Sequence, residues 1–521
     1  MSQLVQVQIA PEEVKDDHAI RTAIADFLNL KIGTFEYKWR KRSLDARKRT
    51  LKINATFEVF GLDEAIVENE QKFKFQDVSG KDEVVIIGAG PAGLYASLQA
   101  IERGLKPIVF ERGKDVKSRR RDLAKLNKDH LVNTESNYCF GEGGAGTYSD
   151  GKLYTRSKKR GDVLKALKWL VEFGADEDIL IDAHPHIGTN KLPKLIENIR
   201  ETIIKAGGEI HFESKLTDIN VENGKIAGIQ INNSEYKKAQ FVILATGHSA
   251  RDVFYLLHHK GIRIEAKPFA LGVRIEHTQN LIDTLQYHGR LNDDFVPPAS
   301  YSLVTQVDGK GVYSFCMCPG GIIAPCATGT EEVVTNGWSP SKRNNPYSNS
   351  GIVVSISPED ITNDKNNPFV CLDFQKKVEK ACWEAAGKTQ RVPAQCMKDF
   401  VEKKKTKEFP RSSYQPGIVS VNLHDILPSF ISERLRKAFI DFGKKMPGYL
   451  TNDAVLHAPE SRTSSPIQIP RDKITLMHPE VYGLFPCAEG AGYAGGIISA
   501  AIDGMKCLDA AVIASGKMFP E

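Results

Sequence analysis

Residues 84–113, VVIIGAGPAGLYASLQAIERGLKPIVFERG, constrain the fold more than any other stretch. They open with four consecutive apolar residues, which predict a parallel strand that is covered on both faces. Gly88, Gly90 and Gly93 then supply GxGxxG: a tight turn, a close backbone approach to a pyrophosphate, and tight packing of the helix that follows. A second strand ends at Glu111, which is placed to accept hydrogen bonds from a ribose. This unit predicts a dinucleotide site, disfavours NADP, and leaves FAD and NAD both open.

The composition is that of an ordinary globular protein. With 521 residues, 41% hydrophobic and 26% charged, we expect two or three domains. The N-terminal residues turn acidic within the first dozen or so positions, and no apolar stretch is long enough to span a bilayer, so neither a signal peptide nor a membrane segment is expected. Nine thinly spread cysteines without a CxxC pair predict reduced thiols and a cytoplasmic location.

The net charge of +5 is unevenly distributed along the chain. Basic runs occur at residues 38–52, 112–128 and 403–407. Each run is interpreted first as solvated surface, with an electrostatic footprint for RNA as the sharper alternative. Because no zinc-finger spacing or aromatic RNA-binding signature accompanies the runs, nucleic acid stays a secondary hypothesis.

Residues 1–78 predict a small separate module. The apolar pattern indicates a strand near residues 4–9, a helix at 19–28, and two strands at 33–42 and 50–60, an order compatible with a ferredoxin-like α+β sandwich. The module contains no cysteine, so it cannot hold an iron–sulfur cluster, and a docking or capping role is expected. A linker is expected to lie within the stretch 73–81.

A second GxGxxG string stands at Gly141, Gly143 and Gly146, but no apolar strand precedes it and no apolar helix follows it. It predicts a flexible loop whose N–H groups approach an anionic or flat ligand, with a plain glycine-rich surface turn as the alternative. The polar contacts expected from the loop are Thr147, Ser149 and Lys152.

His184 and His186 have the spacing of metal ligands but no nearby cysteine or third histidine. They are expected to be structural or to line a pocket. No metal site is predicted.

Two later segments return to the first sheet. Residues 241–244 predict a buried strand that runs into an Ala-Thr-Gly turn, and residues 482–488 predict another that is followed by Glu489 and a third GxGxxG string. An apolar helix, 497–514, comes next, and the 26 residues after Gly495 are too few for a second nucleotide-binding fold. Its N-terminus could instead face an already bound ligand and favour negative charge on a pyrophosphate or a reduced flavin ring.

Between these segments, residues 267–465 predict an inserted β-rich α+β domain. It contains Cys316-Met-Cys318, and a CxC pair can be redox-active, although neighbouring cysteines on one face of a strand are more often simply packed. Arg462 is a candidate contact for an anionic substrate or for the flavin.

The order of these motifs resembles the glutathione-reductase-type FAD fold, in which an Asp normally stands where this chain has Glu489. More closely, FGEGGAGTYSDGKL, ILATGHSARD, KPFALGVRIEH, FCMCPGG, ESRTSSP and CAEGAGYAGGIISAAIDG resemble a bacterial family of FAD-dependent dehydrogenases, NAD(P)/FAD-dependent oxidoreductases with an N-terminal ferredoxin-like extension. The resemblance covers nearly the whole chain and implies FAD as the cofactor. It implies no particular substrate.

The predicted fold class is therefore α/β: a Rossmann-like FAD-binding domain of glutathione-reductase type, with an inserted β-rich α+β domain and an N-terminal ferredoxin-like α+β module. The predicted divisions are 1–78, 79–266, 267–465 and 466–521. The predicted FAD-binding residues are Gly88, Gly90, Pro91, Ala92, Gly93, Glu111, Arg112, Gly143, Gly144, Gly146, Thr147, Ser149, Ala245, Thr246, Gly247, Glu489, Gly490, Gly495, Gly496 and Ile497.

The functional expectation is hydride transfer between flavin N5 and a small organic substrate. The chain lacks a CxxxxC pair after the first glycine motif, which disfavours a disulfide reductase of the glutathione reductase kind. It also lacks a second Rossmann unit, so either NAD(P)H binds transiently over the flavin or the substrate itself donates the electrons. The alternatives are a flavin-containing RNA-binding or RNA-modifying protein and an FAD-binding scaffold without turnover. No catalytic residue is assigned, and the candidates near the ring are Lys152, His248, Cys318, Arg462 and Cys487.

Overall fold

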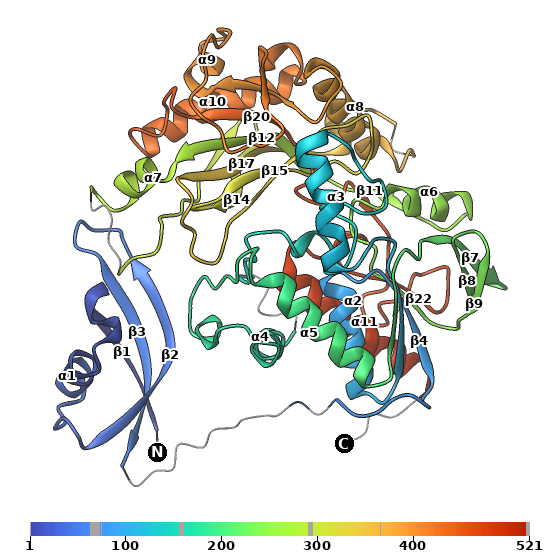
Figure 1. Ribbon diagram of the computed structural model, residues 1–521, viewed down its shortest axis with the longest axis horizontal. Helices are drawn as coiled ribbons and strands as arrows, with labels where there is room; N and C mark the ends of the chain where they lie inside the picture. The colour runs from blue at the N-terminus through green and yellow to red at the C-terminus, as the bar shows by residue number, and fades with distance from the viewer. Residues whose placement is uncertain are drawn as a thin grey trace.

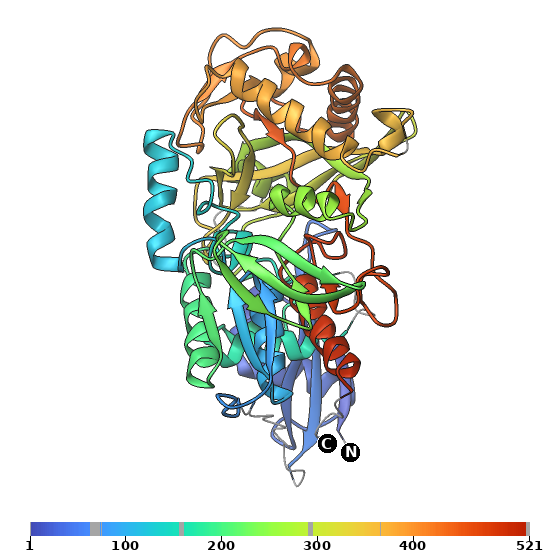
Figure 2. The same ribbon diagram turned by 90° about the vertical axis from the view of Figure 1, so that its right-hand side faces the viewer.

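The computed structural model describes residues 2–62, 73, 75–155, 161–289, 295–364 and 366–516. Most of the predicted linker at 73–81 falls within them, while Lys74 lies outside the described residues. Figures 1 and 2 show three parts: an N-terminal sheet set to one side, a parallel sheet with helices in the lower half, and a larger sheet under helices in the upper half.

The N-terminal part is a βαββ unit whose sheet order is β1-β3-β2, all antiparallel. Its elements are β1 (Gln3–Ile9), α1 (Asp17–Leu28), β2 (Phe35–Asp45) and β3 (Lys52–Gly61). Alternate residues of β1 and β3 are buried against α1, which explains the strict apolar alternation of both strands. The ferredoxin-like assignment stays a prediction, because the described residues supply three strands and one α-helix.

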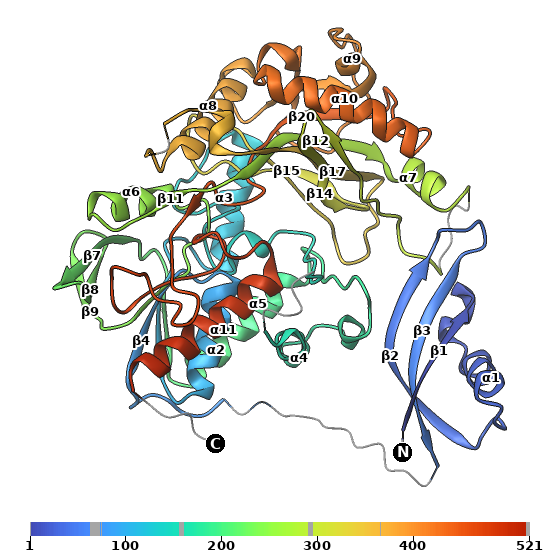
Figure 3. The same ribbon diagram turned by 180° about the vertical axis from the view of Figure 1, so that it is seen from behind.

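The N-terminal sheet docks on the rest of the chain through its basic strand β2. The Arg42 amide donates to the carbonyl of Ile181 at 2.9 Å, and the Arg42 carbonyl accepts from Ala183 at 3.0 Å. The guanidinium of Arg42 pairs with Asp182 at 2.5 Å and with Asp178 at 2.6 Å. Backbone and charge together fix this sheet to the segment between α4 (Val163–Glu172) and α5 (Leu192–Lys205). Figures 1 and 3, which view the molecule from opposite sides, show β2 next to this segment.

The central layer is a five-stranded parallel sheet of order β22-β10-β4-β5-β6. The strands are β4 (Glu83–Ile87), β5 (Lys106–Phe110), β6 (Glu209–His211), β10 (Val242–Leu244) and β22 (Leu484–Pro486). One face is covered by α2 (Pro91–Glu102), α4 (Val163–Glu172), α5 (Leu192–Lys205) and α11 (Ile497–Ala514). The other is covered by β7 (Leu216–Glu222), β8 (Lys225–Ile231), β9 (Glu235–Lys238) and α6 (Arg251–His259).

The four apolar residues that start the glycine motif divide between these two layers. Val84 and Ile86 belong to the cluster under α2 and α11, while Val85 and Ile87 belong to the cluster under the antiparallel meander. A continuous apolar run is therefore needed, because successive side chains of one strand face different cores. The short strand β6 joins the parallel sheet beside β5 and is separate from the antiparallel meander of β7, β8 and β9.

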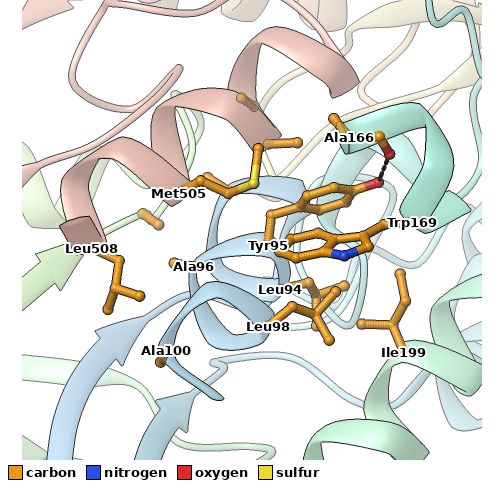
Figure 4. Packing of buried hydrophobic residues seen from close by; sticks show 14 of the residues in the cluster. Leu94, Tyr95, Ala96, Leu98, Ala100, Ala166, Trp169, Ile199, Met505 and Leu508 are labelled. Atoms are coloured by element: carbon orange, nitrogen blue, oxygen red, sulfur yellow. Dashed lines mark hydrogen bonds between the residues drawn. The ribbon is translucent and has the colours of Figure 1, made fainter. Parts of the chain in front are cut away.

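Helices α2 and α11 lie in direct contact on the sheet. A Cβ on Gly504 would stand 2.1 Å from the carbonyl oxygen of Ala92, so only glycine allows this approach. Beneath them, the Tyr95 hydroxyl donates to the Ala166 carbonyl at 2.8 Å, and its ring packs on Trp169 (Figure 4). Helix α2 follows β4 and α11 follows β22, so both helices start from the carboxyl edge of the parallel sheet.

The upper half is built on a seven-stranded sheet of order β13-β14-β17-β12-β20-β18-β19, antiparallel except for β18 and β19. The strands are β12 (Phe269–Thr278), β13 (Val304–Val307), β14 (Lys310–Cys318), β17 (Tyr347–Ile356), β18 (Val392–Cys396), β19 (Ile418–Ser420) and β20 (Val455–Glu460). The helices are α7 (Gln279–Gln286), α8 (Val370–Ala385), α9 (Met397–Val401) and α10 (Ser429–Lys445). Helices α8 and α10 help to bury one face of the sheet.

Shorter elements join the two halves. A hairpin, β15 (Ile322–Pro325) with β16 (Thr335–Trp338), lies near the other face of the large sheet, and α3 (Val116–Asp129) reaches it from below. The chain enters and leaves the upper half through β11 (Glu265–Ala266) and β21 (Ile467–Gln468), which pair antiparallel. All strands of the large sheet lie within residues 269–460. None of the helices in the described part of the chain combines the length and the apolar character that a bilayer crossing requires.

Acidification should destabilise the upper half through two buried histidines. Burial lowers the pKa of His277 and of His457 from the ordinary 6.5 to about 4 in each case. The stability that each neutral ring contributes is complete above pH 6.5 and is lost as the pH falls towards 4, which amounts to about 2 kcal/mol per histidine by pH 5. Urea unfolding at pH 7 and pH 5 measures this loss.

Matched substitutions show whether the buried histidines cause this loss of stability between pH 7 and pH 5. In His277→Gln the loss between pH 7 and pH 5 should shrink by about 2 kcal/mol. His259, on the exposed end of α6, is the control, and His259→Gln should retain the full loss. An equal loss in wild type and His277→Gln would show that this ring does not titrate on unfolding.

Candidate functional site

Four of the predicted site segments follow the carboxyl ends of neighbouring parallel strands, while the second glycine loop follows α3. Ile87 of β4 stands in register with Leu244 of β10 and Phe110 of β5, and Leu244 is in register with Pro486 of β22. The glycine turn, the Ala-Thr-Gly turn, Glu111 and the turn after β22 consequently meet at one edge of the sheet. Ligands of open α/β sheets bind at this edge.

The first glycine turn has the geometry that its sequence predicts. A Cβ on Gly88 would lie 2.4 Å from the Ala245 carbonyl oxygen, and one on Gly93 would lie 1.8 Å from the carbonyl oxygen of Gly88. Gly88 also has φ of +100°, in the region that favours glycine. Gly90 differs, since the only atom of the described residues that its Cβ would meet is the Cα of Gly144, at 3.9 Å. The middle glycine thus borders open space while its two partners are packed.

Glu111 closes the turn from the second strand. Its carboxylate accepts from the amides of Ala89 at 2.8 Å, Gly113 at 2.9 Å and Gly141 at 2.9 Å. Two of these bonds go to Oε1 and one to Oε2, so Oε2 keeps one acceptor position. One ribose hydroxyl can therefore bind to Glu111 without displacing a backbone bond.

The second glycine string forms an ordered loop against the first. The Gly143 amide donates to the Ala89 carbonyl at 2.8 Å, and a Cβ on Gly146 would lie 3.4 Å from Pro91 and 3.3 Å from Ile497. The loop thus lies beside the N-termini of both α2 and α11. The flexible loop predicted from sequence is a short 3₁₀ turn, Gly144–Gly146, within this contact.

The two hydroxyls predicted as ligand contacts bond within the loop. Thr147 donates to the Glu142 carbonyl at 2.7 Å, and Ser149 donates to the Gly146 carbonyl at 2.8 Å. Thr147 is also fully buried. Both side chains therefore shape the loop, and a ligand would meet its backbone.

Arg112 forms ion pairs beside the site. Its guanidinium pairs with Glu135 at 2.6 Å and Asp252 at 2.8 Å and lies 4.1 Å above the ring of Phe140. A contact with the cofactor would have to use the part of the guanidinium that these partners leave free.

The turn after β22 is tied to the Ala-Thr-Gly turn through Glu489. Its Oε1 accepts from the Gly496 amide at 2.6 Å, and its Oε2 lies 3.3 Å from His248 Nδ1. A Cβ on Gly490 would stand 2.9 Å from the Gly247 carbonyl oxygen. Glu489 thus holds the turn that starts α11, a role that its extra methylene relative to Asp permits.

Open backbone and uncapped helices fit a large anionic cofactor at this edge. Among the described residues, no heavy atom lies within 4 Å of a Cβ placed on Gly247, Gly495 or Gly496. The N-cap is a glycine in both α2 and α11, and in the described part of the chain no side chain hydrogen-bonds to either cap. The buried Thr246 hydroxyl has no hydrogen-bond partner among the described residues. Free N–H groups and about half a positive charge at each helix start suit a pyrophosphate.

Sequence reasoning missed the arginine that organises the loop. Arg119 is fully buried and donates to four carbonyls between 2.7 and 2.9 Å, those of Asn137, Tyr138, Glu142 and Gly144. A Cβ on Gly141 would lie 2.6 Å from the Arg119 side chain, which explains that glycine. The sequence shows only a basic run in a helix, and nothing in such a run marks one arginine as buried.

Of the candidates near the ring, Arg462 and Cys487 are occupied by other contacts. Arg462 pairs with Glu332 at 2.5 Å and Glu379 at 3.2 Å, and so does not present a free guanidinium to an anion. Cys487 is fully buried, and its hydrogen bond with Cys507 together with burial raises the pKa of its thiol. His248 lies at the site beside Glu489, whereas Lys152 and Cys318 lie together at the end of β14.

Cys487 also belongs to a small group of potential metal ligands. Its sulfur, a carboxylate oxygen of Asp503 and the sulfur of Cys507 lie within 4.8 Å of one another. Arg471 pairs with Asp503 at 2.7 Å and donates to Cys507 at 3.4 Å, so a cation already stands against this group.

Family models match three parts of the chain. A model described as FAD binding domain matches residues 83–121, and one described as FAD-dependent protein, C-terminal domain-like, matches residues 268–463. A domain of unknown function matches residues 1–60. The two FAD models fall on the glycine-turn unit and on the large sheet.

Relatives and solved structures extend the comparison. The chain is 39% identical over 485 residues to an "Uncharacterized protein" of Clostridium beijerinckii, covering 89% of this chain and 90% of that protein. A thiamine thiazole synthase of Aeropyrum pernix is 24% identical over 184 residues, 33% of this chain and 56% of that protein. The structure of L-proline dehydrogenase from P. horikoshii, at 13% identity, has a TM-score of 0.34 and covers 84% of this chain and 94% of that one.

At so low a TM-score, the structural likeness does not decide between chemistries. The family follows from the near-full-length relative and the two FAD models, which agree with the predicted resemblance and establish FAD as the cofactor. The chain therefore belongs to a family of FAD-dependent oxidoreductases that carry this FAD-binding domain and this C-terminal domain.

Proposed function

We propose that this protein transfers a hydride between FAD and a small organic substrate, with FAD lying along the carboxyl edge of the parallel sheet. The observation that carries the proposal is the pair of adjacent helix N-termini, α2 and α11, that lack side-chain caps and border open glycines. Because both start at one edge, they can stabilise two separated negative charges on the same extended molecule.

Each segment has a distinct binding role in this proposal. The backbone at Gly90 and the start of α2 would hold the pyrophosphate, and Glu111 Oε2 would accept a hydrogen bond from the ribose. The start of α11 would favour the negative charge that a flavin gains on reduction. The loop at Gly143–Gly146 lies across both helix starts, and the Ala-Thr-Gly turn supports the site from below.

The chain's own contribution to the reaction is orientation and exclusion of water. Bound FAD supplies the hydride acceptor or donor at N5. Glu489 holds the α11 turn, and its contact with His248 joins this turn to the neighbouring strand end. The large sheet lies across from this edge in Figures 1 and 2, and we propose that the substrate binds between the flavin and this half of the molecule.

The electron donor separates two forms of this reaction. A pyridine nucleotide that binds transiently would make the protein a reductase, while a substrate that reduces the flavin directly would make it a dehydrogenase or oxidase. Purified protein whose released cofactor has been identified as FAD should be titrated anaerobically with NADH and NADPH, and the flavin absorbance followed. Bleaching within seconds by one nucleotide supports the reductase, and bleaching only by a metabolite supports the dehydrogenase. Bound NAD without flavin would contradict the proposal.

The alternative of an RNA-binding flavoprotein has less support. Its basis is the basic N-terminal module with its run at residues 38–52, in which Arg40 pairs with Glu58, Arg42 with Asp178 and Asp182, and Arg47 with Asp45. Three of the four arginines of this run are thus paired within the chain. Salt-sensitive RNA binding that is lost on removal of residues 1–78 would revive the alternative.

A further inference from the structure

Cys316 and Cys318 stand at the end of β14 in an irregular backbone. Cys316 has φ of +47°, in the left-handed region, and the pairing of β14 with β17 shifts register between Phe315 and Cys318. In a regular strand two such residues would be separated by about 6.5 Å along the strand. Here the Cys318 thiol lies 3.3 Å from the Cys316 carbonyl oxygen, and both sulfurs lie within 3.8 Å of a single atom, Lys152 Nζ. The bulge therefore places the two sulfurs beside the same group.

A lysine from the other half of the molecule lies against both sulfurs. Lys152 Nζ stands 3.8 Å from Cys316 Sγ and 3.7 Å from Cys318 Sγ, and it donates to the Met317 carbonyl between them. Lys152 sits on the loop that continues from the glycines beside α2 and α11. Two cysteines with no partner but each other would be ordinary packing, whereas a shared ammonium group stabilises a thiolate.

The other charges around the two cysteines also favour a thiolate at Cys316. Arg274 donates to the Cys316 carbonyl at 3.4 Å, and its own partner Glu460 lies at 2.7 Å. Asp150 lies 3.6 Å from Lys152 and is paired with Arg343 at 2.9 Å. The hydrogen bond from Cys318, together with Lys152 and Arg274, holds the pKa of the Cys316 thiol well below its usual range against burial and Asp150, and the pKa of Cys318 is raised.

Exposure separates the two sulfurs further. Cys316 is partly exposed, while Cys318 is fully buried. A partly exposed thiolate beside a buried thiol is the arrangement in which one sulfur attacks and the other resolves. The large sheet thus carries an attacking and a resolving cysteine two residues apart.

We propose that Cys316 and Cys318 form a thiol–disulfide redox centre that a small-molecule disulfide oxidises, with Cys316 as the attacking sulfur. The Cys316 thiolate attacks one sulfur of the disulfide, so that a mixed disulfide forms and one thiolate leaves. The Cys318 sulfur then attacks Cys316, which forms the Cys316–Cys318 bond and releases the second thiolate, and the Cys318 proton passes to a released thiolate. Two electrons move from the pair to the small molecule. The proposal goes beyond hydride transfer at the flavin and does not depend on it.

Equilibration of the full-length holoprotein with mixtures of reduced and oxidised glutathione tests the proposal. After acid quenching and alkylation, tandem mass spectrometry should find one reversible disulfide between Cys316 and Cys318. Cys139, the other partly exposed cysteine, should remain a free thiol and be found alkylated. Cys318→Ser should instead accumulate a single glutathione adduct on Cys316. The absence of the Cys316–Cys318 bond from wild type at every glutathione ratio, or an adduct spread equally over Cys139 and Cys316, would overturn the proposal.

Lys152 supplies a second readout that does not depend on disulfide formation. Lys152→Met should slow alkylation of Cys316 by iodoacetamide at pH 7 by about tenfold, because each pKa unit changes the thiolate fraction tenfold. Lys152→Arg keeps the charge and should react like wild type. Equal alkylation rates in Lys152→Met and wild type would show that the lysine does not activate this sulfur.

Discussion

Replacing Gly90 with alanine should weaken FAD binding by about 100-fold while the apoprotein keeps its stability to within about 1 kcal/mol. Gly90 has φ of −74° and an open position for a Cβ, so the apoprotein accommodates alanine with only the small cost of a poorer N-cap. A bound pyrophosphate would meet that methyl group. Displacing the pyrophosphate from one or two charge-assisted hydrogen bonds costs about 3 kcal/mol, which lowers the affinity for FAD by about two orders of magnitude.

Fluorescence titration of apoprotein with FAD and urea unfolding without FAD separate the two effects. Gly93→Ala should behave differently, because its methyl group would lie 1.8 Å from the Gly88 carbonyl oxygen and should destabilise the apoprotein by several kcal/mol. Gly80→Ala, at an open position away from the site, should change neither quantity. Wild-type affinity in Gly90→Ala would mean that the pyrophosphate does not pass over this residue.

Replacing Arg462 with methionine should destabilise the protein by about 3–5 kcal/mol at pH 7. The Arg462 side chain is 6% exposed and pairs with Glu332 and Glu379. It also donates hydrogen bonds to the hydroxyls of Thr328 at 2.8 Å and Ser249 at 3.2 Å. Arg251 pairs with the same two carboxylates. The variant would leave two buried carboxylates to share one guanidinium between the two halves of the molecule.

The effect should depend on pH in a defined direction. Although burial alone would raise it, Arg462 and Arg251 hold the pKa of Glu332 far below its usual range. The stability that the ionised Glu332 contributes is therefore complete above the ordinary glutamate pKa of about 4.5, and it is lost as the pH falls below that value. Urea unfolding should show the difference between wild type and Arg462→Met shrinking below pH 4.5.

An exposed ion pair provides the control. Lys380 and Glu331 are 2.8 Å apart with side chains 51% and 61% exposed, so Lys380→Met should cost about 0.5 kcal/mol or less. A cost below 1 kcal/mol for Arg462→Met would mean that the buried network is not needed to join the halves.

Local patterns predicted the parts of the fold that depend on neighbours in sequence. The apolar run before Gly88 and the spacing to Glu111 identified β4, α2 and β5, because backbone sterics fix what such a unit can form. The helix at 497–514 was predicted at the observed bounds for the same reason. The order of the strand ends then brought the predicted site segments to one edge.

Contacts between distant residues were beyond such patterns. Arg462 had the residue type of an anion-binding site, and only its long-range pairing with Glu332 and Glu379 shows that the charge is already balanced. Thr147 and Ser149 similarly satisfy carbonyls of their own loop. The activation of Cys316 depends on Lys152, which is 164 residues away. No local periodicity records such pairings.

The contact between α2 and α11 has a consequence for synthesis of the protein. Gln99 on α2 donates to Asp509 on α11, 410 residues later in the chain. During translation α2 consequently lacks its partner helix until residues 497–514 have been synthesised. A product terminated before α11 would therefore keep the glycine turn but lack the second of the two helix starts that the proposed cofactor site requires.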